Sequence, residues 1–264
     1  MIDLHSHILP GLDDGPSTLE ESIEMCRMAA ADGIRTIVAA PHFKPGRYGA
    51  EESVILERTA ELKNALASQS ILIRIIPASE VTITPELSEH LASRNWLFIN
   101  KTGKYFIAEF GNDVVPPQWS FLFSSLLRSG RIPIITHPER CSRFADHPEE
   151  LRDFVEKGGL VQITAMSLTG ELGEEIQELA EAMLRDGLVH VIATDAHSAT
   201  WRPPLLSRAV ARAAAIVGRD RALAMVTEIP AAIIEGKSIA ALPPAVPEEA
   251  PKRGSWIDKI IGRR

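Results

Sequence analysis

Strand-like and helix-like segments alternate along almost the whole sequence, and this alternation constrains the fold more than any other feature. Short apolar runs, many of them rich in β-branched residues, each precede a longer helical segment, which is typical of buried parallel strands joined by helices. After a strand at the N-terminus, the expected strands are Ile34–Ala40, Ile71–Pro77, Trp96–Ile99, Tyr105–Ala108, Ile132–Thr136, Leu160–Thr164 and Val189–Ala193. Helices are expected at about Ser17–Asp32, Glu51–Gln69, Pro85–Arg94, Pro117–Ser129, Glu171–Asp186 and over most of Pro204–Glu235. About seven such units predict an α/β protein whose sheet closes into a TIM-like barrel of the (β/α)7 type.

Polar residues that can bind metal stand at or just past the ends of these strands. They are His5, His7, His42, Glu80, Glu109, His137, Asp195 and His197. In a parallel barrel the carboxyl ends of all strands converge on one face, where active sites are built. An open doubly wound sheet would instead place its site at one switch point. The distribution therefore favours the barrel.

The N-terminal stretch Asp3-Leu4-His5-Ser6-His7 predicts the start of a metal site. Residues i and i+2 of a strand share a face, so both imidazoles can point at one ion. A His-x-His pair alone is common in polar loops; here the recurrence of similar residues decides. With Asp14 the set holds five histidines and four carboxylates, which suits Mn, Fe, Zn or Co and exceeds the ligands of one ion. Two or three ions with a bridging carboxylate indicate metal-assisted hydrolysis of a phosphate ester.

Composition excludes several classes of protein. The net charge of -7 argues against nucleic-acid binding, and there is neither a signal-peptide pattern nor an apolar run long enough to span a membrane. Two cysteines give no disulfide framework, which fits a cytoplasmic protein. A phosphatase with a cysteine nucleophile would need an arginine six positions after its cysteine. Asp32 and His147 stand at those positions after Cys26 and Cys141, so that mechanism is excluded.

Several motifs resemble those of the polymerase and histidinol phosphatase (PHP) superfamily. They are Asp3-Leu4-His5-Ser6-His7, Pro41-His42, Glu80, Thr136-His137-Pro138-Glu139-Arg140 and Thr194-Asp195-Ala196-His197. Within it, the segments His7–Gly15, Ala108–Phe110 and His137–Arg140 are similar to the bacterial metal-dependent protein-tyrosine phosphatases of capsule and exopolysaccharide operons. The resemblance covers about residues 1 to 240.

The resemblance implies a distorted barrel with a trinuclear site that is usually supported by manganese. One ion would be held by His5, His7, Glu80 and Asp195, a second by Glu80, Glu109 and His137, and a third by Asp14, His42 and His197. It also implies a phosphotyrosine protein as substrate, in particular a membrane-associated bacterial tyrosine kinase, and leaves open whether the chain forms a homo-oligomer.

Arg140 and Arg202 are the candidates for binding the phosphate, and Asp14 is counted with them among the catalytic residues. A guanidinium fork matches phosphoryl oxygens bidentately, and both arginines lie on loops that follow predicted ligands. The alternative is that they only form salt bridges with Glu139 or other acids at the rim. The expected mechanism is attack of a metal-activated hydroxide on phosphorus, with the arginines and ions stabilising the developing charge.

Two positions depart from the pattern of the family. A Gly-Gln pair usually precedes the position of Glu80, where this chain has Ala78-Ser79, and an aromatic residue usually stands where this chain has Cys141. Neither change affects a predicted ligand. Both concern the shape of the pocket, and hence the preference for phosphotyrosine.

The remaining histidines have simpler interpretations. His90 is expected to be solvated on a short helix, and His147 to stand at the entry of a helix. His190 opens a strand at the end remote from the chemistry, where a role in stability is expected.

The chain changes character at about Leu242. Residues 1–241 form the expected barrel, whereas 242–264 read as a Pro-rich linker followed by a short basic amphipathic tail. Such a tail can lie on an anionic membrane or dock on a partner; the alternative is that it folds back on the barrel or stays disordered.

Three functions compete at this point. The first is a protein-tyrosine phosphatase acting on a bacterial tyrosine kinase or its substrates, and so regulating capsule or exopolysaccharide production. The second is a small-molecule phosphatase of the same superfamily, such as histidinol phosphatase. The third is a regulatory subunit without turnover, which the complete set of nine ligands disfavours.

Overall fold

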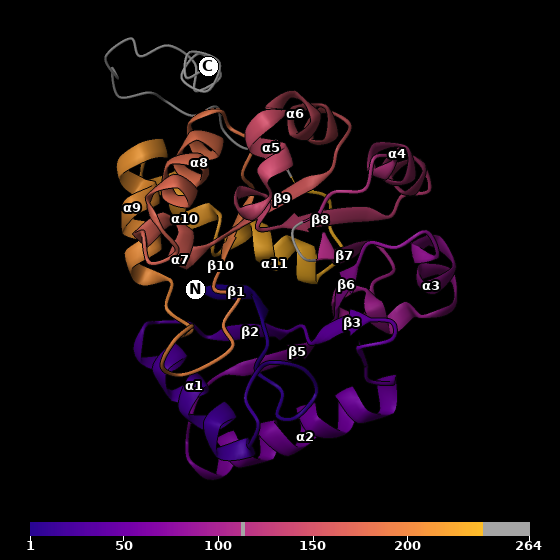
Figure 1. The fold of residues 1–264 in the computed structure, drawn as a ribbon. Coiled ribbons are helices and arrows are strands. Elements are labelled where there is room, and N and C mark those ends of the chain that lie inside the picture. Colours follow the sequence, from indigo (N-terminus) through magenta and orange to yellow (C-terminus); the bar gives the residue numbers. More distant parts are fainter. Residues whose placement is uncertain (112–113, 240–264) are drawn as a thin grey trace.

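The computed structural model describes residues 1–111 and 114–239 as a mixed α/β fold in which helices surround mostly parallel strands (Figure 1). The strands in this part of the chain are β1 (Ile2–Ser6), β2 (Thr36–Ala39), β3 (His42–Lys44), β4 (Tyr48–Gly49), β5 (Arg74–Pro77), β6 (Glu80–Thr82), β7 (Tyr105–Glu109), β8 (Ile132–Thr136), β9 (Leu160–Thr164) and β10 (Val191–Ala193). The α-helices are α1 (Leu19–Ala31), α2 (Glu52–Ser68), α3 (Leu87–Ser93), α4 (Trp119–Arg128), α5 (Ser142–Asp146), α6 (Pro148–Glu156), α7 (Ala165–Thr169), α8 (Glu174–Arg185), α9 (Ser207–Val217), α10 (Arg219–Ala224) and α11 (Glu228–Ile234). Short 3-10 turns are η1 (Asn95–Leu97), η2 (Ile99–Lys101) and η4 (Pro138–Arg140).

The strands form two sheets whose neighbours are parallel, except for the β3–β4 hairpin. The first sheet has the order β1-β2-β5, and the second has the order β10-β9-β8-β7-β6-β3-β4. Every residue of β7 and β9 is buried, which agrees with the continuous apolar character expected of parallel strands covered on both faces. In Figure 1, α1 and α2 cover the first sheet, and the remaining helices surround the second.

Backbone hydrogen bonds connect the two sheets at both of their meeting points. At one, β2 and β5 lead directly into β3 and β6, and the break is bridged by bonds from Ala78 N to Ala39 O (2.8 Å) and from Glu80 N to Pro41 O (3.0 Å). At the other, His7 N donates to Ala196 O (2.8 Å), which places β10 beside β1. The ends of β1, β3, β6 and β10 are therefore held close together.

A buried carboxylate strengthens the second meeting point. Asp3 is fully buried, and its two oxygens accept hydrogen bonds from the Thr194 backbone N–H (2.9 Å) and the Thr194 hydroxyl (2.5 Å). Burial raises the pKa of Asp3 to about 6, although the two bonds from Thr194 oppose this shift. The contact fixes the start of β1 to the loop that carries Asp195 and His197.

Most elements lie where the alternation predicts, but three expectations were wrong in detail. The expected strand Trp96–Ile99 is instead a pair of 3-10 turns, because the chain turns at Asn100 (φ 51°) and a short apolar run alone does not distinguish the two. The spacing of Ser17 and Glu20 predicts a capping box at the start of α1, but the structure forms it with Thr18 and Glu21, a pair that has the same spacing. The segment from α5 to α7 contains helices that the sequence did not predict.

None of the helices in the described ranges combines the length and the apolar character that crossing a bilayer requires. The Pro-rich linker and basic tail predicted at 242–264 lie outside the described residues.

Candidate metal centre

All nine predicted metal ligands lie together on the face where β1, β7, β8 and β10 end and where the chain passes from β2 to β3 and from β5 to β6; Asp14 comes from the loop after β1. His5 lies in β1 and His7 follows it; His42 and Glu80 begin β3 and β6; Glu109 ends β7; His137 follows β8; Asp195 and His197 follow β10. Proximity of their donor atoms divides most of them into three overlapping groups: first His5, His7 and Glu80; second His7, Asp14, His42 and His197; and third His42, Glu80 and Glu109. The nine side chains come from six strand ends, so the fold and not the local sequence brings them together.

The first group is the most deeply buried. The Nε2 atoms of His5 and His7 face one another at 3.1 Å, and each lies 3.4 Å from an oxygen of Glu80. Oδ1 of Asp195 lies 3.7 Å from His5 Nε2 and 3.5 Å from His7 Nε2. These four residues are the set that the family resemblance assigns to one ion.

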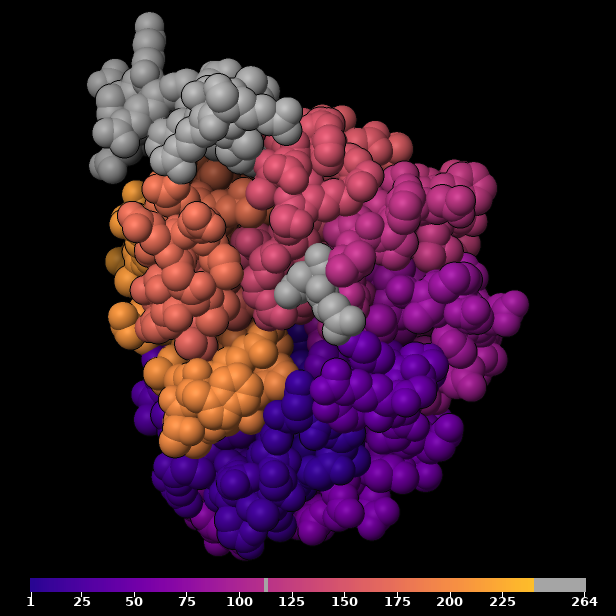
Figure 2. Space-filling view, in the orientation of Figure 1, coloured from indigo at the N-terminus to yellow at the C-terminus, as the bar shows by residue number. Residues whose placement is uncertain are grey.

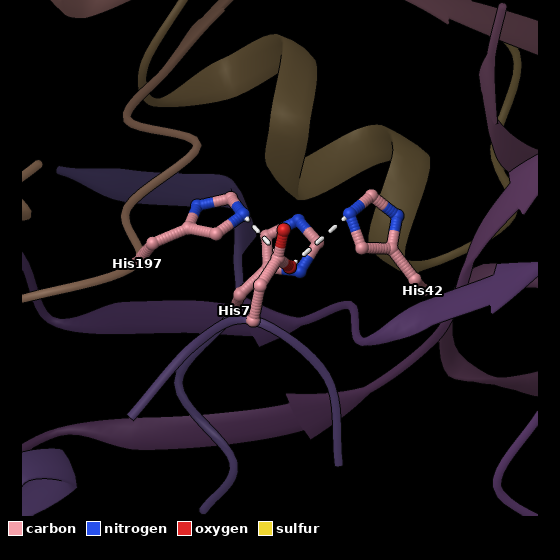
Figure 3. Close-up of side chains that lie close together, drawn as sticks. His7, His42 and His197 are labelled. Carbon is pink, nitrogen blue, oxygen red and sulfur yellow. Dashed lines mark ion pairs between the residues drawn. The ribbon is translucent and has the colours of Figure 1, made fainter. Parts of the chain in front are cut away.

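The second group lies nearer to the pocket opening. Asp14 Oδ1 is 3.4 Å from His42 Nε2 and 3.5 Å from His197 Nε2, and Figure 3 shows the two imidazoles approaching from either side of His7. Hydrogen bonds from His197 and His42 hold the pKa of Asp14 well below its usual range. Asp14 is therefore ionised at neutral pH and suited to binding a cation.

The third group differs from the set that the resemblance implies. Glu80 and Glu109 are joined by His42, whose Nδ1 lies 3.0 Å from Glu80 Oε2 and 3.4 Å from Glu109 Oε1. His137 approaches Glu80 Oε1 with its Nε2 at 3.4 Å, but it is not among the atoms grouped with Glu109. Glu80 thus contacts four imidazoles and is the central carboxylate of the site.

Buried polar groups behind the imidazoles orient them. His7 Nδ1 lies 2.7 Å from Asp13 Oδ2, His5 Nδ1 lies 3.1 Å from Gln162 Oε1, and His197 Nδ1 lies 2.8 Å from the Asp195 backbone oxygen. Each contact uses Nδ1 and leaves Nε2 directed at the cluster. This is the pattern that fixes the tautomer of metal-binding histidines.

The sequence did not single out Asp13 or Gln162. Asp13 adjoins Asp14 in one Asp-Asp-Gly turn, where spacing alone does not say which carboxylate faces the imidazoles. Gln162 had a usable signal, because it is a polar residue in the middle of the apolar strand β9.

The charged groups of the cluster shift one another's pKa values. Burial alone would raise the pKa of Glu80, but His5, His137 and His42 hold it well below its usual value. Burial would likewise lower the pKa of His42, yet Asp14, Glu109 and Glu80 raise it to about 12. The pKa of His197 is lowered to about 4 by burial and by His7. Four carboxylates this close together repel one another, so cations next to them stabilise the arrangement.

Arg140 and Arg202 both reach the cluster through Asp195. Arg140 Nη1 lies 3.1 Å from Asp195 Oδ2, and Arg202 Nη2 donates to the same oxygen. Asp195 therefore presents Oδ1 to the imidazoles and Oδ2 to the arginines. The alternative interpretation predicted salt bridges between these arginines and Glu139 or another acid at the rim, and the acid that they contact is Asp195. Glu139 instead accepts hydrogen bonds from Thr164 N (2.9 Å) and the Ser167 hydroxyl (2.7 Å).

Two of the ligand-bearing turns adopt strained backbone conformations. His137 and Asp195 have φ values of 38° and 50°, in the left-handed region that residues other than glycine rarely occupy. Such conformations cost about 1–3 kcal/mol each and persist where the surrounding structure enforces them, as at many active sites.

The cluster opens into a polar pocket of about 170 Å³. In Figure 2 the orange loop after β10 lies beside the indigo N-terminal segment at this face of the molecule. The pocket is lined by Asp14, His42, Lys44, Arg47, Tyr48, Glu80, Glu109, His137, Arg140, Asp195, His197 and Arg202. The sequence had not singled out Lys44, Arg47 or Tyr48.

Five imidazoles and four carboxylates gather in one cluster, and seven of these nine side chains line the pocket together with Arg140 and Arg202, an arrangement that fits a metal-dependent hydrolase. The model of the family described as "Capsular polysaccharide synthesis, CpsB/CapC" matches residues 1–235. The chain belongs to this family.

Proteins with established names resemble the chain over most of its length. It is 40% identical over 202 residues to the tyrosine-protein phosphatase YwqE of Bacillus subtilis, covering 76% of this chain and 79% of the relative. It is 35% identical over 208 residues to the putative tyrosine-protein phosphatase CapC of Staphylococcus aureus, covering 79% and 81%. A solved structure from work on YwqE and on CpsB of Streptococcus pneumoniae, described as "unique metal-dependent tyrosine phosphatases", superposes with a TM-score of 0.87 at 36% identity, covering 92% of this chain and 98% of the other.

Proposed function

We propose that this chain is a metal-dependent protein-tyrosine phosphatase, a phosphoric monoester hydrolase, that acts in capsule or exopolysaccharide synthesis. The observation that carries the proposal is the convergence of nine predicted metal ligands, seven of which line one pocket together with Arg140 and Arg202. The names of the relatives support the same reaction, because they are tyrosine-protein phosphatases and the solved relative is metal-dependent.

We also propose that the parallel strands constitute a distorted seven-stranded barrel. In this interpretation β2 with β3, and β5 with β6, each count as one interrupted strand. The hydrogen bonds between β5 and β6 and their neighbours, and the Ser6–Ala196 bridge, support this closure. The barrel would explain why residues from six strand ends meet at one face.

The residues present fit divalent metal ions. Buried carboxylates and imidazoles converge, and Glu80 Oε2 and His42 Nδ1 lie buried 3.0 Å apart without the geometry of a hydrogen bond. We assign His5, His7, Glu80 and Asp195 to one ion, Glu80, Glu109 and His137 to a second, and Asp14, His42 and His197 to a third. Manganese is the first choice, with Fe, Zn or Co compatible with the same donors. Bound ions of this kind lower the pKa of water and so supply a hydroxide nucleophile at neutral pH.

The arginines would bind and orient the phosphoryl group. Their guanidinium groups come from two loops, after β8 and after β10, and both line the pocket. Two forks from different directions hold the phosphoryl oxygens in one orientation and stabilise the charge that grows on them in the transition state. Asp195 keeps both forks at the mouth before the substrate arrives.

The leaving group needs little help from a proton donor. The conjugate acid of a phenolate has a pKa of about 10, well below that of an alkoxide. Asp14, which was counted among the catalytic residues, is held ionised by His197 and His42 and so does not serve as a general acid at neutral pH. Its proposed role is that of a ligand at the open side of the cluster.

The substrate would be a phosphotyrosine protein, in particular a membrane-associated tyrosine kinase or a target of one. The relatives CapC and CpsB are named tyrosine-protein phosphatases, and the family description names capsular polysaccharide synthesis; both support a phosphotyrosine protein as the substrate. A cytoplasmic location, a homo-oligomer and a membrane or partner contact through the tail stay predictions from the sequence.

Side-by-side kinetics test the proposed function. The full chain, loaded with manganese, would be assayed on a tyrosine-phosphorylated peptide and on histidinol phosphate. His137→Ala is the test variant, and His147→Ala is the matched control because His147 is an exposed histidine outside the site. Hydrolysis of the peptide that is lost in His137→Ala and kept in His147→Ala supports the proposal. Preference for histidinol phosphate would overturn it.

A further inference from the structure

We propose that the β3–β4 hairpin is a substrate-recognition element that binds acidic side chains next to the phosphotyrosine. The inference rests on the proposed function and specifies its substrate class. Its central residues are Lys44 and Arg47, two cations that line the pocket on the hairpin. Neither forms an ion pair with any residue in 1–111 or 114–239, whereas Arg140 and Arg202 at the same mouth both contact Asp195.

The strand alternation of β3 directs Lys44 towards the site. His42 and Lys44 are two residues apart on β3, so their side chains share a face. Because His42 points into the metal-binding cluster, Lys44 extends the same face by one step of about 7 Å towards the outside. Phe43 points the other way and is buried edge-on against His90 (5.2 Å) and Trp96 (5.6 Å). His90 is thus partly packed, although the sequence predicted a solvated residue.

A rigid turn fixes Arg47 and Tyr48 beside Lys44. Arg47 N donates to Lys44 O (2.9 Å), which closes the turn Lys44-Pro45-Gly46-Arg47. Pro45 at the second position and Gly46 at the third, with φ of 85°, are the residues that a type II turn requires. The turn places Tyr48 directly opposite Lys44 in the hairpin. The two cations are therefore held in place without a bound ligand.

Ring contacts hold the outer end of the hairpin against the metal-binding cluster. The Tyr48 ring stacks on the His42 imidazole with a centroid distance of 5.6 Å and an interplanar angle of 10°. The Arg47 guanidinium lies over the Tyr48 ring at 5.0 Å, a cation–π contact that leaves its N–H groups available at the rim. Arg47 is exposed, and Lys44 is half-buried.

The geometry selects an anionic group close to the phosphate. Arg202 lies on the loop of His197, whereas the hairpin begins at His42, and Figure 3 shows these two imidazoles on opposite sides of His7. A phosphoryl group held by Arg140 and Arg202 leaves Lys44 and Arg47 without an anion. An extended peptide advances by about 3.3–3.6 Å per residue, so a carboxylate one to three residues from the phosphotyrosine spans the step from His42 to the hairpin. Carboxylates are the peptide groups that complement these cations.

The experiment compares two phosphotyrosine peptides on the manganese-loaded full chain. One carries two glutamates on each side of the phosphotyrosine, and the other carries alanines. The variant Lys44→Gln/Arg47→Gln removes both cations, and Lys63→Gln/Arg74→Gln removes two exposed cations elsewhere as the matched control. The measured quantities are kcat/KM for each peptide and peptide binding by fluorescence anisotropy.

The wild type and the control are expected to favour the acidic peptide, and the hairpin variant to lose roughly three- to ten-fold of this preference, mainly in KM. Raising the salt concentration would reduce the preference in the wild type but not in the hairpin variant. If the ratio of kcat/KM between the acidic and the alanine peptide is the same in the wild type and the hairpin variant, the inference is overturned. An equal loss of kcat/KM on both peptides would overturn it as well. Binding separates the two proposals. If the acidic peptide binds more tightly in a way that depends on Lys44 and Arg47, but neither peptide is hydrolysed, the inference about the hairpin stands and the proposed function is wrong. If both peptides bind equally well, the inference about the hairpin alone is wrong.

Discussion

Asp13 is the residue whose replacement tests the arrangement of the metal centre most directly. Its side chain is 1% exposed, and one oxygen lies 2.7 Å from His7 Nδ1 while also accepting from His42 N (2.9 Å). The other oxygen accepts from Gly15 N (2.9 Å). Burial alone would raise the pKa of Asp13, but His7 and the backbone N–H groups lower it to about 2, so the acceptor is a carboxylate at every working pH.

The change Asp13→Asn keeps the shape of this side chain and removes its charge. With one oxygen left for three N–H donors, either a donor loses its partner or the amide donates to His7 Nδ1. In the second case the His7 proton moves to Nε2, the atom that faces His5 and Glu80, and its lone pair is no longer available to a metal ion. We expect manganese affinity to fall by about 10- to 100-fold, equivalent to about 1.4–2.7 kcal/mol of binding free energy.

Isothermal titration of the metal-free chain with manganese measures this loss. Asp220→Asn is the matched control, because Asp220 is an exposed aspartate on α10 outside the site. Phosphatase activity of Asp13→Asn is expected to recover in part at high manganese concentration, since Asp13 itself is not assigned to an ion. A dissociation constant within twofold of the wild type would refute the role assigned to Asp13.

Three further changes probe other parts of the molecule. Glu80→Gln is expected to lower activity at least about 100-fold and to weaken metal binding, since Glu80 contacts four imidazoles. Wild-type activity together with unchanged metal binding would contradict this. Arg140→Lys is expected to reduce kcat about 100-fold because a lysine cannot form the bidentate fork, and an unaltered kcat would show that the phosphate lies elsewhere. Burial and Arg221 lower the pKa of His190 to about 4, so the fold keeps this imidazole neutral and loses stability as the pH falls from about 6.5 to 4. His190→Asn is expected to remove on the order of 3 kcal/mol of that dependence in urea unfolding of the metal-free chain, and equal pH slopes would count against it.

The gathering of the ligands was predictable because it depends only on the order of strands and on their direction. Every predicted ligand except Asp14 stands at or just past the end of an apolar run, and parallel strands bring those ends to one face whatever the details of their pairing. The same logic failed for the run Trp96–Ile99, whose residues are buried in 3-10 turns rather than in a strand. Apolar composition reports burial there but not backbone conformation.

The partners of the ligands were not predictable, since they depend on contacts between distant segments. Gln162 lies 157 residues from His5 in the sequence, and Thr136 on β8 donates to Glu80 on β6 (2.9 Å). No periodicity indicates which strand end is adjacent in space. For the same reason the sequence assigned the ligands to ions by resemblance, whereas the structure places His42 between Glu80 and Glu109.

Asp195 shows how one side chain resolves two interpretations that the sequence kept apart. The arginines were expected either to bind phosphate or to form salt bridges with a rim acid, and in the structure Arg140 and Arg202 share Oδ2 of Asp195. The left-handed backbone at Asp195, with φ of 50°, turns its carboxylate so that Oδ1 remains directed at His5 and His7. The salt bridge to Asp195, a predicted metal ligand, therefore keeps both guanidinium groups beside the cluster instead of removing them from the site. The salt bridge therefore does not exclude the proposed contact with phosphate, because a phosphoryl group that approached the cluster would meet the same N–H donors.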